Sequence, residues 1–253
     1  MDIIYTFIVL LFGLIIGSFL NVCIYRIPRQ ESIAWPGSHC PDCGYVLKWY
    51  DLFPVLSYIF LGGKCRQCRS HISWRYPLVE ALTGMLFVLA YRYDGLSAGL
   101  IVHLVFLCLL VVIAFIDLEH LIIPNKLVLP GTVLGLLFTL ITHSPTPISG
   151  FLSALGAGLF FFIIWFFYPQ GMGEGDIKLA LMLGAFLGWP LIPIAIFIAA
   201  LSGTIVGVIY ITTKGGGRKT QIPFGTFLAF GSVVALFYGE RLVSSYLRLI
   251  GWQ

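Results

Sequence analysis

The stretch "FFFIIWFFYPQGMGEGDIKLALMLGAFLGW", residues 160–189, places charged residues between two long apolar runs. The charged residues are Glu174, Asp176 and Lys178. Each apolar run has the composition of a segment that enters or crosses a lipid bilayer. Because a charged side chain is costly in a bilayer, one that is found there is by default a candidate for function. The stretch therefore predicts a membrane protein with acidic groups at the mouth of a spanning helix.

The composition of the whole chain supports this class. Of 253 residues, 59% are hydrophobic and 10% are charged, and the mean hydropathy is +0.97, well outside the usual soluble range. A spanning helix needs about 20 mostly apolar residues. We predict an all-α polytopic membrane protein of about eight helices, the sixth of them short: 3–25, 77–93, 97–116, 121–142, 148–168, 177–189, 191–212 and 223–240.

The basic residues predict the orientation, because loops on the cytoplasmic side carry an excess of Lys and Arg. With the N-terminus outside, all 15 Lys and Arg residues fall on the inside except Arg92, Arg241 and Arg248. The first segment has no basic residue before its apolar run, so we expect a retained anchor and not a cleaved signal peptide. In a bacterium this topology predicts the inner (plasma) membrane. The net charge of +4 then reflects topology, so we expect no nucleic-acid partner.

The only long polar segment, residues 26–76, contains two C-x2-C motifs. Four thiolates in this spacing suit one tetrahedral Zn²⁺ ion, with no open position for a catalytic water. Two disulfides are the alternative, which a reducing cytoplasm disfavours, and His39 and His71 are interpreted as surface residues. The predicted ligands of a structural zinc are Cys40, Cys43, Cys65 and Cys68.

Two acids stand at matching ends of predicted helices. Asp117 follows the third span and Asp176 begins the sixth, so both are expected near the cytoplasmic face. Two neighbouring carboxyl groups in a poorly solvated place share one proton, as in aspartyl proteases. The alternatives are that Asp176 only caps its helix, and that Asp117 lies in an aqueous turn and pairs with Lys126.

The ends of the two helices suggest which acid is charged. A helix C-terminus disfavours a carboxylate at Asp117, and a helix N-terminus favours one at Asp176. The hypothesis is that Asp176 is the base and Asp117 the protonated partner. Gly171, Gly173 and Gly175 are expected to adopt positive φ and to let a substrate strand run past Asp176.

Six ordered blocks give the chain a resemblance to the bacterial type IV prepilin peptidases. Besides the double cysteine motif, they are "GSFLNVCIYRIPR" at 17–29, "ISWRYPLVE" at 72–80, "IDLEHLIIPNKL" at 116–127, "GMGEGDIKLALMLGAFLGW" at 171–189 and "IPFGTFLAFG" at 222–231. The resemblance implies a GxGD intramembrane aspartyl protease in which Asp117 and Asp176 are catalytic. The family often has Pro at the position of Thr226, a departure that is not expected to touch the acids.

The resemblance also implies the reaction and the partners. A peptidase of this kind cleaves the leader of type IV prepilins and of type II secretion pseudopilins on the cytoplasmic side, after a glycine. It then methylates the new N-terminus with S-adenosylmethionine. Residues expected to shape the peptidase site are Gly173, Glu174, Gly175 and Lys126, and those expected to serve the methyltransferase half are Asn21, Arg26 and Glu80. The lipid bilayer is the other expected partner, and no oligomeric state follows from the sequence.

These inferences divide the chain into three parts: the first helix at 1–25, a tetracysteine domain at 26–76 and a protease domain of about seven helices at 77–253. A different class of function stays open. A zinc-bearing transporter or channel would use Asp117, Glu119 and Asp176 as a cation path. A scaffold for a pilus or secretion assembly would need neither aspartate.

Overall fold

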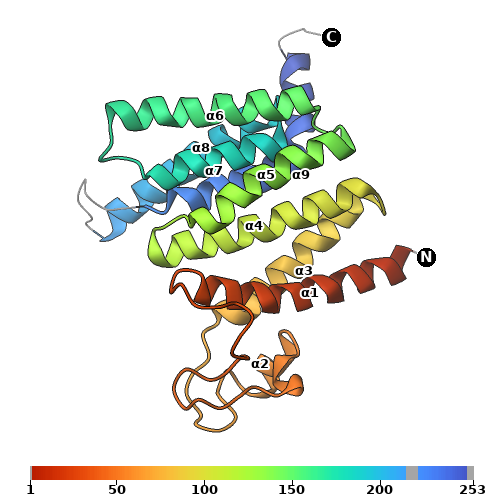
Figure 1. Ribbon diagram of the computed structural model, residues 1–253, viewed down its shortest axis with the longest axis vertical. Helices are drawn as coiled ribbons and strands as arrows, with labels where there is room; N and C mark the ends of the chain where they lie inside the picture. Colours follow the sequence, from red (N-terminus) through yellow and green to blue (C-terminus); the bar gives the residue numbers. More distant parts are fainter. Residues whose placement is uncertain (1, 215–221, 250–253) are drawn as a thin grey trace. The chain divides into compact units, whose positions relative to one another are not determined.

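The computed structural model describes residues 2–214 and 222–249 and is built of helices joined by turns (Figure 1). Within those residues, extended segments pair only in two isolated β-bridges, His39 with Val46 and Lys64 with His71. The predicted all-α class is confirmed. Arg218 and Lys219, which contribute to the charge asymmetry of the sequence, lie outside the described residues.

Each predicted span corresponds to a helix. The long helices are α1 (Asp2–Arg26), α3 (Arg75–Asp94), α4 (Ala98–His120), α5 (Asn125–Thr142), α6 (Pro147–Phe167), α7 (Glu174–Leu187), α8 (Leu191–Lys214) and α9 (Phe224–Leu249). Among the described residues, six of them are long and apolar enough to cross a membrane: α1, α4, α5, α6, α8 and α9. The spanning role of α3, which carries charged residues at both ends, and of the 14-residue α7 remains a prediction.

Many large apolar side chains are exposed along these helices. On α6, for example, Ile148, Phe151, Leu155 and Phe166 all face outward. A soluble protein rarely exposes contiguous apolar patches of this extent. Such a surface is compatible with lipid and not with water, so the chain is a multi-pass membrane protein.

The chain forms two compact units, residues 1–112 and 113–253, and α4 crosses the boundary. In the first unit α1 packs against α3. The backbones approach closely at Gly17, where an added Cβ would lie 2.7 Å from the Cα of Glu80. The cysteine-containing segment connects these two helices and includes a 3-10 helix, η1 (Trp49–Leu52), and the short α2 (Leu56–Phe60).

In the second unit α7 contacts four helices, α5, α6, α8 and α9. From Leu179 onward nearly all of its residues are buried. Gly184 makes the closest approach, because a Cβ there would lie 2.4 Å from the Ser153 carbonyl oxygen of α6. A helix that is enclosed in this way needs apolar residues all round, which explains why α7 resembles a span despite its length.

The structure differs from the predicted boundaries mainly at the end of α9, which continues to Leu249 instead of stopping near 240. Polar residues such as Arg241 and Ser244 ended the apolar pattern there, although they are compatible with a helix. The three-part division of the chain remains a prediction. It assigns α3 to the protease domain, whereas α3 belongs to the first compact unit and packs there against α1.

Candidate active site and cysteine cluster

Asp117 is a buried acid in the last turn of α4, and its side chain is held by the start of α9. The residue is 5% exposed. Its Oδ2 accepts the backbone N–H of Thr226 at 2.8 Å, and the Thr226 hydroxyl lies 3.2 Å from the same oxygen. The interpretation of Asp117 as a residue of an aqueous turn is therefore wrong. Lys126, its supposed partner, is exposed in the first turn of α5.

Asp176 is a buried acid in the first turn of α7. The residue is 7% exposed, and its Oδ2 accepts the backbone N–H of Gly173 at 3.2 Å. This bond satisfies one of the free N–H groups at the helix start. Asp176 therefore caps the start of α7. It is also buried, which a capping role does not require.

The two acids lie close enough to interact electrostatically. Ile123 lies against two glycines, Gly175 and Gly225. A Cβ on Gly175 would lie 2.8 Å from the Ile123 Cβ, and a Cβ on Gly225 would lie 2.8 Å from the Ile123 Cδ1. The starts of α7 and α9 thus meet around Ile123, with one acid beside each of these two helix starts.

The glycines beside Asp176 serve a purpose other than the predicted one. Gly173 has φ −79°, and neither Gly171 nor Gly175 is among the glycines with positive φ, so that expectation is wrong. The backbone at Gly175 is already helical, and the requirement there is space, since Ile123 occupies the place of a side chain. Gly171 is likewise crowded by the ring of Tyr168.

Glu174 is exposed at the same helix start. Its side chain is 68% exposed, and its Oε2 lies 4.0 Å from the Lys178 Nζ one turn later. An exposed pair of this kind contributes little to stability. The negative charge of Glu174 beside the positive end of α7 is a further favourable interaction of modest size.

The four cysteines of the two C-x2-C motifs form a compact cluster in the first unit. All four sulfur atoms lie within 4.8 Å of one another. The Sγ atoms of Cys40 and Cys68 are 3.8 Å apart, and those of Cys43 and Cys65 are 4.0 Å apart. Zn–S bonds of about 2.3 Å in a tetrahedron require sulfur separations of about 3.8 Å. The cluster can therefore hold one zinc ion with four thiolate ligands.

The backbone around the cluster repeats itself. The N–H of Cys40 donates to the Tyr45 carbonyl, and the N–H of Cys65 donates to the Ser70 carbonyl, five residues on in both cases. The fourth residue after each of these cysteines, Gly44 or Arg69, has positive φ. Two equivalent turns thus present two sulfur atoms each, which is the arrangement of paired zinc knuckles.

The pKa values of the thiols show why a cation suits this place. Burial raises the pKa of Cys40, but N–H groups of Cys43 and Asp42 outweigh it and lower that pKa to about 6. The N–H of Tyr45 lowers the pKa of Cys43, whereas desolvation and the neighbouring sulfur atoms raise it to about 12. Four sulfurs at this distance carry four negative charges only when a metal ion balances them.

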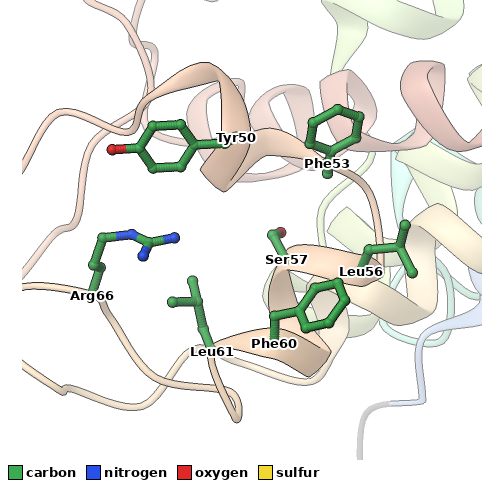
Figure 2. Close-up of a pocket in the computed structure, with 7 residues that line it drawn as sticks. All are labelled: Tyr50, Phe53, Leu56, Ser57, Phe60, Leu61 and Arg66. Atoms are coloured by element: carbon green, nitrogen blue, oxygen red, sulfur yellow. The ribbon is translucent and has the colours of Figure 1, made fainter.

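A pocket of about 390 Å³ lies beside the cluster, and Figure 2 shows its lining. Arg66 enters it from one side, and Phe53 and Phe60 lie opposite. The Arg66 Nε is 2.8 Å from the Asp51 Oδ1. Burial raises the pKa of Asp51, but its hydrogen bonds with Arg66 and the Lys48 amide hold that pKa below the ordinary value. The full lining is Tyr50, Phe53, Leu56, Ser57, Phe60, Leu61 and Arg66.

Asn21, Arg26 and Glu80 are buried. Asn21 joins α1 to α3, and Arg26 and Glu80 fasten the cysteine-containing segment to these two helices. Asn21 Nδ2 donates to the Tyr76 carbonyl at 3.0 Å, and Arg26 Nη1 donates to the Ser32 carbonyl at 2.9 Å. The Val55 N–H donates to the Glu80 Oε2 at 2.7 Å. Each of these side chains thus binds backbone of its own unit.

Three residues around the acids were not among the predicted site residues: Thr226, Gly225 and, against Gly175 and Gly225, Ile123. The expectation that position 226 does not touch the acids is wrong, since Thr226 is the hydrogen-bond partner of Asp117. One signal was present: Pro223 just before an apolar run is typical of a helix start, where N–H groups are free to bind an acid. Nothing in the local pattern says which acid they would meet.

Comparison with known proteins gives matches along most of the chain. Residues 11–93 match the family described as "Bacterial Peptidase A24 N-terminal domain", and residues 104–208 match the "Type IV leader peptidase family". Three relatives are each named "Prepilin leader peptidase/N-methyltransferase". The one from Pseudomonas aeruginosa is 33% identical over 96% of this chain and 94% of its own. The one from Legionella pneumophila is 35% identical over 94% and 92%, and the one from Bacillus subtilis is 34% identical over 96% and 98%. No solved structure matches.

Proposed function

The chain belongs to the type IV leader peptidase family, and from that membership we propose that it cleaves the leader peptides of type IV prepilins and pseudopilins and then methylates the new N-terminus. The relatives carry both activities in their name. The observation that carries the peptidase half is the pair of buried acids, Asp117 and Asp176, that interact across the starts of α7 and α9.

The acid pair supports hydrolysis by a shared proton. The charged carboxyl takes a proton from a water molecule, whose oxygen attacks the peptide carbonyl carbon, while the protonated carboxyl donates to the carbonyl oxygen. When the tetrahedral intermediate collapses, the C–N bond breaks, the carboxyl that took the water proton gives it to the leaving amine, and the other carboxyl takes back a hydroxyl proton of the intermediate. The pair ends with one proton, as it began. Asp117 and Asp176 are therefore the proposed catalytic residues, and Gly173, Glu174, Gly175 and Lys126 are proposed to shape the approach to them.

The four cysteines are proposed to hold a structural Zn²⁺. A segment of about fifty residues has too small a core to fold securely, and a metal supplies folding free energy directly. With four protein ligands the ion has no open position, so it takes no part in proteolysis.

S-adenosylmethionine is proposed as the methyl donor. The residues of the pocket beside the cysteine cluster suit such a molecule: the rings of Tyr50, Phe53 and Phe60 can pack on a purine, and a guanidinium can bind a carboxylate. Arg66 is neutralised by Asp51, so the pocket does not repel a sulfonium cation. Arg26 and Glu80 are proposed to support this activity by fastening the segment to α1 and α3, and Asn21 by joining these two helices.

We also propose the bacterial inner membrane as the location, with the N-terminus outside and the tetracysteine domain in the cytoplasm. The excess of Lys and Arg in the loops on one side supports this orientation. The proposed substrates are cleaved on that side, after a glycine. The alternative of a transporter or channel is not favoured, because the relatives along the whole chain are peptidases by name.

The test is cleavage of a purified prepilin in detergent by the wild-type chain and by Asp117→Asn and Asp176→Asn. Each substitution keeps the shape of the side chain and removes a carboxyl group that can exchange a proton, so cleavage is expected to fall by at least about a thousandfold. Glu240→Gln is the control, because this exposed acid lies about 24 Å along α9 from its start. Full processing by either aspartate variant would exclude the acid pair.

A further inference from the structure

We propose that Thr226 is a positioning residue that holds Asp117 as the charged member of the acid pair, so that the shared proton resides on Asp176. The inference rests on the proposed peptidase function and assigns the two acids in the order opposite to the one that the helix ends of the sequence suggested. It follows from a contact between residues 109 positions apart.

Thr226 offers Asp117 its backbone N–H, and a hydroxyl whose one proton is shared between Asp117 and the Ala114 carbonyl oxygen. Its backbone N–H lies 2.8 Å from Oδ2, and its hydroxyl lies 3.2 Å from Oδ2 and 3.0 Å from the Ala114 carbonyl oxygen. Thr226 is the third residue of α9, where backbone N–H groups have no acceptor within the helix. The amide therefore needs an outside acceptor, and a charged oxygen is the strongest one available.

Asp176 receives weaker hydrogen bonding than Asp117. Within the described residues, its one hydrogen bond comes from the Gly173 N–H and is 3.2 Å long. Donors stabilise the charged form of a carboxyl group over the protonated form. With a shorter backbone bond and a share of the Thr226 hydroxyl proton, Asp117 is the better place for the negative charge that the pair carries.

Asp117 lies between two helix ends of opposite polarity. Asp117 does lie at the negative end of α4, but it also lies at the positive end of α9, whose first residue is Phe224. A direct N–H bond at 2.8 Å outweighs the diffuse field of a helix end, which is worth about 0.3–1 kcal/mol. For Asp176, the N-terminus of its own helix α7 is the helix end that favours a negative charge.

Packing fixes the start of α9, so the N–H and hydroxyl of Thr226 keep their position relative to Asp117. The ring of Phe224 packs on that of Phe161, with centroids 6.0 Å apart. A Cβ on Gly225 would lie 3.0 Å from the Asp117 Oδ2, so the carboxyl group rests against the backbone itself. The carboxyl of Asp117 therefore cannot leave the helix start without a change in packing.

Other ionisable groups near the acids are more exposed than the acids themselves. Within the described residues, the charged or titratable side chains on the adjoining helix ends, besides Asp117 and Asp176, are Glu119, His120, Lys126, Glu174 and Lys178. None of them is buried, so solvent screens their charge. The charge distribution within the pair is thus set mainly by hydrogen bonds.

The direct test is solid-state NMR of the full chain in lipid with aspartate labelled at the carboxyl carbon. Asp117→Asn and Asp176→Asn assign the two signals. In the wild type we expect the Asp117 signal at the carboxylate position and the Asp176 signal at the carboxylic acid position. Equal signals, or the reverse order, would overturn the inference. In Thr226→Pro the two signals should move toward each other, because proline has no N–H and no hydroxyl and is well tolerated in a first helical turn.

Cleavage kinetics give a second readout. Thr226 touches an acid and not the substrate, so its variants should change kcat and leave KM unchanged. We expect Thr226→Ser to match the wild type, Thr226→Val to lose a few-fold and Thr226→Pro to lose about tenfold at neutral pH. At acidic pH the loss in Thr226→Pro should be larger, because the charged form of the pair is then harder to maintain. Thr132→Val is the matched control, since the Thr132 hydroxyl donates to the Val128 carbonyl of its own helix.

The outcomes separate this inference from the proposed function. Absence of cleavage by the wild type would remove the function, whereas the NMR signals still report where the proton resides. A folded Thr226→Pro with wild-type kcat at every pH would remove the inference and leave the function intact. If that variant does not fold, the comparison of Thr226→Val with Thr226→Ser decides, and equal kcat values would count against the role of Thr226.

Discussion

Gly175 and Gly225 are small because Ile123 and the Asp117 carboxyl group occupy the places where their side chains would lie. Neither glycine has positive φ, so backbone freedom is not the reason for either. The two positions differ in what a methyl group would displace. At Gly175 it would meet the branched Cβ of Ile123, and at Gly225 it would meet the end of the Ile123 chain and the acid.

Gly225→Ala is expected to reduce cleavage more than stability. The Ile123 Cδ1, 2.8 Å away, is the flexible end of a side chain and can move, whereas the Asp117 Oδ2, 3.0 Å away, is in the reacting group. A displacement of a few tenths of an ångström should lower kcat about tenfold and cost about 1 kcal/mol of stability. The measurements are cleavage kinetics and thermal unfolding in detergent.

Gly156→Ala is the control for this change, because nothing lies within 4 Å of the Cβ that it adds to α6. It should leave both quantities unchanged or raise stability slightly. If both variants have wild-type kcat, the tight contact at Gly225 does not position Asp117.

At the scale of the element, α7 combines an exposed start with an enclosed remainder. Glu174 is exposed, yet Leu179, Ala180, Met182 and Leu183 are almost completely buried. A helix that contacts four others cannot shift without moving them, which keeps Asp176 fixed at its first turn. The small residues of α6 and α7 make this close packing possible, as in other membrane helix pairs.

Gly184→Ala should separate α6 from α7. The added Cβ would lie 2.4 Å from the Ser153 carbonyl oxygen and 2.6 Å from the Ala154 Cα, and backbone atoms cannot turn aside as side chains can. We expect a loss of about 2 kcal/mol in the free energy of unfolding, measured by thermal or denaturant unfolding in detergent. Gly203→Ala on α8 is the matched change, because its Cβ would meet Phe227 at an ordinary 3.4 Å. Equal stability of the two variants would contradict the packing argument.

At the scale of the whole molecule, the two chemistries lie in different compact units. The cysteine cluster belongs to residues 1–112, and the two acids of the proposed catalytic site belong to residues 113–253. The chain thus combines a unit with a proposed zinc site, where metal binding and folding would be coupled, with one in which a buried helix supplies the rigidity.

Removal of zinc should therefore affect the two proposed activities unequally. We expect one zinc per chain by elemental analysis, and none after Cys40→Ser with Cys65→Ser. Methylation should be lost in that variant because its segment unfolds, whereas cleavage should keep a substantial part of its rate. The control is the same chain with Cys108→Ser, a thiol of α4 outside the cluster. Equal loss of both activities would mean that the metal stabilises both units.

The sequence by itself determined the membrane class, the number and approximate bounds of the helices, the paired cysteine knuckles and the family to which the chain belongs. These depend on hydropathy, on spacing along the chain and on motifs, all of which are local. The tertiary structure alone decided that the start of α9 meets Asp117, that Thr226 donates to it, and that Ile123 is the reason for two glycines. Such contacts join residues far apart in the chain, and the packing of the helices, which no local pattern encodes, brings them together.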